Sequence, residues 1–185
     1  ALMRRHYSLL GTSAFVSPLH YQYGAIARLE SSSKIDSLLK NGYSTLSLGY
    51  TGLKEMVYFM RNASIYDSSG KSFALKVLKF IQKKLDYYTV DTGVGFVLYA
   101  TPSKEVGKHL CLIDQENFDD IILDSYTPMF GMDDKVPYEE RLKIESEYQR
   151  FTKGGSISFV QGKEIEDKKK FIQFIYETNL YVSLK

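Results

Sequence analysis

The residues best placed to do chemistry lie in Ala100-Thr101-Pro102-Ser103-Lys104-Glu105, directly after the apolar run Phe96–Ala100. Thr101 is a residue type that caps helices, and Pro102 suits the first helical position because its missing N–H is unpaired there in any case. The free amides of Ser103, Lys104 and Glu105 would then point out from the carboxyl end of a buried strand, with the helix dipole behind them. Such a helix start binds anions such as phosphate. An ordinary capped helix that binds no ligand explains the same residues.

Other polar or glycine-rich positions are explained by structure. Gly49-Tyr50-Thr51-Gly52 and Gly154-Gly155 fit tight turns, and neither matches a dinucleotide fingerprint or a P-loop. His6, His20 and His109 are scattered, so we expect no metal site in this chain. The single cysteine, Cys111, is flanked by Leu110, Leu112 and Ile113, and we expect it in the core and not as a catalyst. The sequence assigns no catalytic residue.

Hydrophobic periodicity predicts the elements that position the hexapeptide. Strands are predicted at residues 14–21 around Pro18, at 43–48, at 96–100, where the run suggests burial on both faces, and at 156–160. The end of the chain, from Asn179, is also strand-like. Helices are predicted near residues 3–10, 34–40 with a cap at Asn41-Gly42, 53–60, 72–88, from Thr101, 138–148 and 164–178. In the last helix, Ile165, Ile172, Ile175 and Tyr176 are predicted to be buried. Alternating strands and helices predict an α/β fold.

Composition narrows the protein class. The 185 residues fit one domain, and 24 basic against 22 acidic side chains give a net charge of only +2. No strong field therefore favours direct nucleic-acid binding or an anionic membrane. No apolar run reaches the roughly 20 residues that span a bilayer, no signal peptide is evident, and one cysteine allows no internal disulfide. We expect a soluble protein of the reducing cytoplasm.

Several segments, in order along the chain, resemble the anaerobic (class III) ribonucleoside-triphosphate reductases of the glycyl-radical family. Asn41-Gly42 with Ser47–Glu55 resembles the family pattern "NG...SLGYIGL.E", and Thr92–Ser103 resembles "TGYGFSLYSTPSE", which is the most specific match. Asp124–Phe130 corresponds to "YYTNSFH" and Thr152–Phe159 to "NGGFI.Y". With a looser match over 4–28, the resemblance covers essentially the whole chain.

The resemblance implies about the second half of a ten-stranded α/β barrel, so residues 1–185 would form a single partial domain with both ends truncated. It implies reduction of ribonucleoside triphosphates to deoxyribonucleoside triphosphates through a thiyl radical generated by a glycyl radical. The parent enzyme would use formate and a structural zinc. Its partners would be the rest of the reductase chain and a radical S-adenosylmethionine activase. No cofactor is assigned to this chain.

The resemblance also implies site residues. Thr101, Pro102, Ser103 and Lys104 would fall where related radical reductases hold substrate phosphate. Tyr126, Thr127, Met129 and Phe130 would lie in a loop near the active site.

The chain departs from the family pattern in two places. Residues 127–131 replace the family's asparagine, serine and histidine, and Lys153 replaces an asparagine, which puts substrate contacts there in doubt. The thiyl cysteine, the zinc cysteines and the glycyl-radical segment would lie outside the sequence.

Two interpretations follow. The first is a segment of a full reductase, inactive alone, which provides barrel wall and part of the nucleotide site; the alanine start and strand-like end favour it. The second is a divergent stand-alone module that binds nucleotide or a partner without catalysis, and the altered loop favours it. Either predicts self-association into a homo-oligomer, because a half-barrel exposes strand edges and apolar faces.

Overall fold

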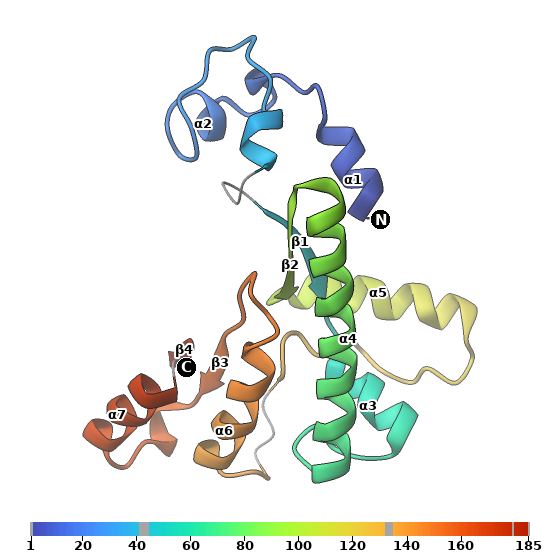
Figure 1. Ribbon diagram of the computed structural model, residues 1–185. Helices are drawn as coiled ribbons and strands as arrows, with labels where there is room; N and C mark the ends of the chain where they lie inside the picture. Colours follow the sequence, from blue (N-terminus) through green and yellow to red (C-terminus); the bar gives the residue numbers. More distant parts are fainter. Residues whose placement is uncertain (1, 41–44, 132–134, 179, 185) are drawn as a thin grey trace. The chain divides into compact units, whose positions relative to one another are not determined.

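The computed structural model describes residues 2–40, 45–131, 135–178 and 180–184, and it divides into two compact units. The first comprises residues 1–48 and 85–97, and the second comprises 49–84 and 98–185. The chain passes between the units within β1 (Thr45–Tyr50), α4 (Ser68–Thr92) and β2 (Gly95–Ala100) (Figure 1). Strands and helices alternate along the chain, as predicted for an α/β fold.

The first unit is built from short helical segments. It contains α1 (Leu2–Leu9), a 3-10 turn at Ala14–Val16, α2 (Pro18–Tyr21) and a second 3-10 turn at Asp36–Leu39. Ala14, Ile35 and Leu38 form its buried cluster. The strand predicted at 14–21 is wrong: Pro18 begins α2, where its fixed φ suits the first turn of a helix. The helix predicted at 34–40 is a 3-10 turn, and its predicted cap at Asn41-Gly42 lies outside the described residues.

The second unit carries α3 (Leu53–Arg61), α5 (Lys104–Asn117), α6 (Tyr138–Gln149), β3 (Ser158–Val160), a 3-10 turn at Gly162–Glu164, α7 (Lys168–Thr178) and β4 (Val182–Leu184). β3 and β4 pair in parallel with Ser158 opposite Val182, and α7 makes the crossover between them. Leu142, Val160, Phe171 and Leu180 form a buried cluster where α6, β3 and α7 pack. No helix among the described residues combines the length and apolar content that a membrane span requires.

Strand β2, which pairs with β1, has one buried face. Phe96, Leu98 and Ala100 are buried, whereas Gly95, Val97 and Tyr99 are only half-buried. The prediction that this strand is buried on both faces is therefore wrong, although its position is confirmed. Its neighbour β1 reaches Tyr50, two residues beyond the predicted strand end, so Gly49 and Tyr50 belong to the strand and not to the turn.

The burial predicted for the last helix is confirmed only in part: Ile165 and Ile175 pack against the buried cluster, whereas Ile172 and Tyr176 are exposed. Gln161 and Glu164 form a reciprocal capping box around a 3-10 turn, and α7 begins only after Asp167, whose carboxylate accepts from the amides of Lys169 and Lys170. Phe171, which the prediction did not include, is the buried residue of α7. Helix α4 matches its prediction better. It extends beyond residues 72–88 at both ends, and its four predicted solvent-facing lysines are exposed: Lys76, Lys79, Lys83 and Lys84.

Candidate functional site

Segments far apart in the sequence meet at the carboxyl ends of β1 and β2. The amide of Thr101 donates to the carbonyl oxygen of Tyr50 at 2.9 Å, which places the two strand ends side by side. The amide of Met129 donates to the carbonyl oxygen of Thr101 at 3.1 Å. Next to them, the amide of Ala100 donates to the carbonyl oxygen of Gly155 at 3.0 Å. The structure thus brings the hexapeptide together with the predicted loop at 126–130 and with the glycine pair.

Helix α5 begins later than the sequence suggested. Ser103, and not Thr101, is the N-cap, and its hydroxyl accepts from the amide of Val106 at 3.3 Å. Pro102 therefore precedes the cap and does not occupy the first helical position. The predicted capping by Thr101 is wrong because its backbone continues the β2 edge, bonded to Tyr50 and Met129 through its N–H and C=O. The first-turn amides belong to Lys104, Glu105 and Val106.

A carboxylate already sits at this helix start. Glu105 accepts a hydrogen bond from the Ser103 hydroxyl at 3.0 Å. Its own backbone N–H and then the Ser103 hydroxyl lower the pKa of the Glu105 carboxyl below its usual range. Negative charge is therefore favoured at this end of α5, as expected at a helix N-terminus. An anionic ligand would have to compete with Glu105 for the same donors.

The loop at residues 126–130, which the sequence predicts near an active site, is hydrogen-bonded to the turn between β1 and α3. The carbonyl oxygen of Thr127 accepts from the amide of Gly52 at 2.9 Å and from the hydroxyl of Thr51 at 3.0 Å. The Thr127 hydroxyl donates to the carboxylate of Glu55 in the first turn of α3. One residue thus fixes the loop through both its backbone and its side chain.

Met129 and Phe130, the last two residues of this loop, are buried. Met129 adopts φ of 53°, a left-handed conformation that is unusual for a residue with a side chain, and its N–H bond to Thr101 holds it. The ring of Phe130 lies 5.5 Å, centroid to centroid, from the ring of Tyr148 on α6. In this arrangement Met129 and Phe130 contribute packing, and Tyr126 and Thr127 are the partly exposed members of the predicted set.

Tyr126 connects the loop to α5. Its hydroxyl donates to the carboxylate of Asp114 at 2.6 Å, and this hydrogen bond, followed by burial, raises the pKa of Tyr126 to about 12. Its backbone packs so closely on α5 that a Cβ at Gly107 would lie 2.3 Å from the carbonyl oxygen of Tyr126. Cys111, one turn further along α5, is buried as predicted, and burial raises the pKa of its thiol.

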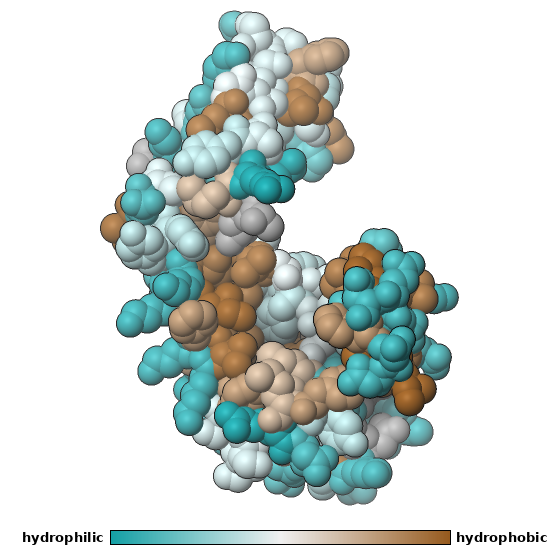
Figure 2. Space-filling view, turned by 90° about the vertical axis from the view of Figure 1, so that its right-hand side faces the viewer, coloured by the Kyte–Doolittle hydropathy of each residue, from teal (hydrophilic) through white to brown (hydrophobic). Residues whose placement is uncertain are grey.

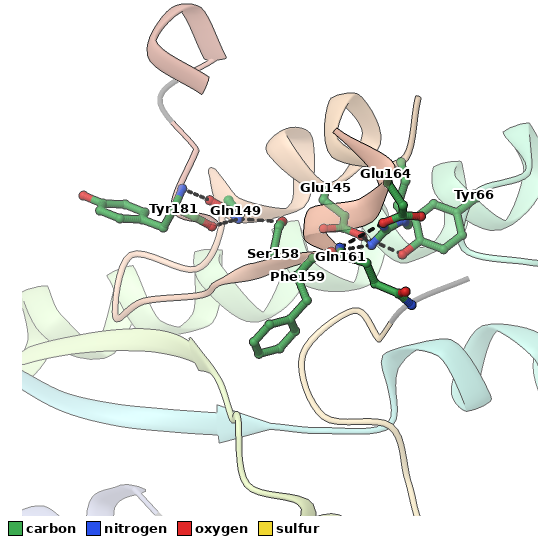
Figure 3. A network of polar contacts seen from close by, with 9 residues as sticks. Tyr66, Glu145, Gln149, Ser158, Phe159, Gln161, Glu164 and Tyr181 are labelled. Atoms are coloured by element: carbon green, nitrogen blue, oxygen red, sulfur yellow. Dashed lines mark hydrogen bonds and ion pairs between the residues drawn. The ribbon is translucent and has the colours of Figure 1, made fainter. Parts of the chain in front are cut away.

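Sequence reasoning missed a buried polar network on α6 (Figure 3). Arg141 and Glu145 are 1% and 0% exposed, and their charged groups lie 3.9 Å apart. Arg141 also donates to the carbonyl oxygen of Phe159 at 2.7 Å, while Glu145 accepts from the Tyr66 hydroxyl at 2.7 Å. Burial raises the pKa of Glu145 despite these partners.

The network extends along α6 to its carboxyl end. Gln149 donates to the hydroxyl of Ser158 at 3.0 Å and accepts from the amide of Tyr181 at 3.2 Å, so it links α6 to β3 and to the residue before β4. The signal that could have found this network is helical spacing: Arg141, Glu145 and Tyr148 recur at intervals of four and three residues, beside the apolar Leu142 and Ile144. Because Arg141 and Glu145 are polar, their sequence pattern does not indicate that this face of α6 is buried.

Comparison with known proteins agrees with the resemblance seen in the sequence. The family model for anaerobic ribonucleoside-triphosphate reductase matches residues 1–184. The anaerobic ribonucleoside-triphosphate reductase of Enterobacteria phage T4 is 30% identical over 184 residues, covering 96% of this chain and 29% of that protein. The enzyme of Escherichia coli K12 is 28% identical over 186 residues, covering 96% of this chain and 26% of that protein.

Solved structures show the same fold. The anaerobic ribonucleotide reductase of Thermotoga maritima with dATP bound in the specificity site aligns with a TM-score of 0.67 at 17% identity, over 77% of this chain and 26% of that one. The same enzyme in complex with dATP and CTP aligns with a TM-score of 0.64 at 16% identity, with the same coverage of 77% and 26%.

These relatives are much longer than this chain of 185 residues. The chain spans between a quarter and three-tenths of their length. The family match nevertheless extends over all but one of its 185 residues. The chain belongs to the anaerobic ribonucleoside-triphosphate reductase family.

Proposed function

We propose that this chain is part of an anaerobic reductase that converts ribonucleoside triphosphates to deoxyribonucleoside triphosphates for DNA synthesis. It would supply barrel wall and a substrate-phosphate site at Thr101–Lys104. The observation that carries the proposal is the convergence of four segments at the ends of β1 and β2: residues 49–52, 98–104, 126–130 and 154–155. The same segments carry the family resemblance in the sequence.

The geometry supports an anion site at the start of α5. Helix α5 has 14 residues, so its dipole is fully developed, and its first turn includes the amides of Lys104 and Glu105. The Lys104 side chain is exposed and can add a mobile positive charge. A triphosphate carries several negative charges and would compete with the single carboxylate of Glu105 for these donors.

The parent family implies a glycyl radical, a thiyl radical and a structural zinc, with formate as reductant. The residues of this chain do not fit the zinc, because Cys111 is its single cysteine and a structural zinc site takes four ligands. Cys111 is also buried in α5, with its thiol donating to the carbonyl oxygen of Leu123. The proposed contribution of this chain is therefore nucleotide binding and shape, and the radical steps are proposed for other parts of the parent enzyme.

Nucleotide titration of the full chain tests the phosphate site. Lys104→Gln should weaken binding of a ribonucleoside triphosphate several-fold, whereas Glu105→Gln should strengthen it because the competing charge is removed. Lys108→Gln removes another exposed positive charge one turn further along α5 and is the matched control. Equal weakening by Lys104→Gln and Lys108→Gln would rule out a local site.

The second candidate is a stand-alone module that binds nucleotide or a partner without catalysis. The burial of Met129 and Phe130 favours it, because these loop side chains are not presented to a ligand. The intact mass of the native gene product, isolated from its own anaerobically grown cells, separates the candidates. A polypeptide much larger than 21.2 kDa supports the reductase, and one near that mass supports the module.

The proposed partners can be tested with the larger polypeptide. We propose that it acts in the cytoplasm as a homo-oligomer and that a radical S-adenosylmethionine activase installs its radical. Anaerobic turnover of ribonucleoside triphosphates with formate should then depend on prior incubation with that activase. Turnover without activation would contradict the radical mechanism.

A further inference from the structure

A groove unrelated to the phosphate site lies beside α3. It is lined by the exposed side of that helix, the connection to α4 and the segment after α5, all within the second unit, and it has a volume of about 710 Å³. The face that carries α3 and α5 is turned to the viewer in Figure 2, where hydrophobic side chains gather between hydrophilic ones. The volume suits several side chains of a bound segment.

Large apolar side chains line the groove and remain exposed. Tyr58 and Phe59 on α3 are 58% and 53% exposed, and their rings meet edge to face at 5.8 Å. Across the groove, Ile122 is 90% exposed. Exposed aromatic and aliphatic side chains that surround one concavity are typical of protein interaction sites, because such surface gains most from removal from water.

The charges around these apolar residues are mainly negative. Glu55, Asp67 and Asp120 line the groove, against one basic side chain, Lys54. Glu55 Oε1 accepts from Thr127, and its Oε2 is buried with no hydrogen-bond partner among the described residues. Oε2 is closed to solvent, so Glu55 contributes negative charge beside the groove and is not a direct contact for a ligand cation.

We propose that this groove binds an amphipathic segment of a partner protein that carries Lys or Arg beside its apolar side chains. The apolar side chains pack on Tyr58, Phe59 and Ile122, and the cations meet the exposed carboxylates of Asp67 and Asp120. The acidic rim repels nucleic acid and anionic lipid, which leaves a basic polypeptide as the complementary partner. Because Glu55 also holds Thr127, the partner lies beside a residue that fixes the loop at 126–130.

Fluorescence polarisation on the full chain tests the proposal with a labelled peptide of Leu and Lys at helical spacing. A peptide of the same composition with its Leu residues scrambled off one face is the first control, and a Leu/Glu peptide is the second. The Leu/Lys peptide should bind at least about five-fold more tightly than either. Its affinity should fall as salt rises, since screening weakens the exposed charge pairs. Equal binding of the scrambled or the Leu/Glu peptide would overturn the proposal.

Matched variants test whether the Leu/Lys peptide binds in the groove beside α3. Phe59→Ser and Asp120→Lys should each weaken the Leu/Lys peptide at least about five-fold. Phe80→Ser, at a phenylalanine that is 62% exposed on α4, and Asp91→Lys, at an exposed aspartate near the end of α4, should leave binding unchanged. Unchanged circular dichroism shows that the variants fold.

Two further outcomes would contradict the proposal. The first is equal weakening by the groove variants and the α4 controls. The second is concentration-dependent self-association that Phe59→Ser abolishes, because the occupant would then be a second copy of the chain. Hydrogen exchange should instead show peptide-dependent protection of amides in residues 54–63 and 118–123.

Discussion

Replacing Arg141 with methionine removes the cation that faces Glu145 inside the second unit. Methionine keeps a long apolar stem in the core, so the main loss is electrostatic. In the wild-type chain Glu145 is 0% exposed and accepts a hydrogen bond from Tyr66; the variant should keep that hydrogen bond but lose the ion-pair partner. An unpaired buried carboxylate is strongly unfavourable, and the side chain can escape only by binding a proton.

The free-energy cost of protonating Glu145 sets the size of the destabilisation. An unfolded glutamate titrates near pH 4.3, and each pKa unit corresponds to about 1.36 kcal/mol. Holding Glu145 protonated therefore costs at most about 3.7 kcal/mol at pH 7 but only about 1 kcal/mol at pH 5. Because burial already raises the pKa of Glu145 in the wild-type chain, the loss is the remaining part of this cost, and we expect Arg141→Met to lower the free energy of unfolding by up to about 3 kcal/mol at pH 7 and by much less at pH 5.

Urea denaturation of the full chain measures this loss. With a typical slope of about 2 kcal/mol per molar urea, the midpoint should fall by up to about 1.5 M at pH 7. The double variant Arg141→Met with Glu145→Gln should regain most of the stability, because the glutamine is neutral and can still accept from Tyr66. A loss that is equal at both pH values, or that persists in the double variant, would show that Arg141 acts through packing or through its hydrogen bond to Phe159, and it would refute the reasoning from the Glu145 charge.

Three further predictions concern single groups. Burial raises the pKa of Glu145, so between pH 4.3 and the folded pKa the folded state binds more protons than the unfolded state. The free energy of unfolding should therefore fall as pH rises through that window. Urea titrations at several pH values should show that Glu145→Gln flattens this dependence. Gly107→Ala would normally favour a helix, but its Cβ would meet the carbonyl oxygen of Tyr126. Thermal and urea unfolding should therefore show that the free energy of unfolding falls by about 2 kcal/mol. Lys108→Ala is the control and should be nearly neutral. Cys111 should react slowly with a thiol reagent in the folded chain and fast in denaturant, and rapid reaction of the folded chain would contradict its burial.

The sequence predicted most elements where hydrophobic periodicity alone decides them. α4 and β2 lie where their apolar patterns place them, because a long amphipathic stripe and a short continuous apolar run each have one common structural solution. The prediction of a strand across Pro18 was wrong because Pro18 is compatible with both an edge strand and a helix start. The cap of α5 was misplaced because Thr101 and Ser103 are both capping residues, and the backbone bonds of Thr101 to Tyr50 and Met129 exclude it from that role.

Two properties were already determined by the amino-acid sequence: the α/β order of elements and the family, since both depend on local patterns and on the order of short motifs. Only the tertiary structure decided which polar residues are buried. Arg141 and Glu145 look like solvent-facing members of a charged helix, but α6 packs between Tyr66 and β3, so they face inward and pair. Likewise, Thr127 and Glu55 lie 72 residues apart in sequence and meet only because the loop returns across the end of β1. Contacts between distant segments follow from packing, which no local pattern encodes.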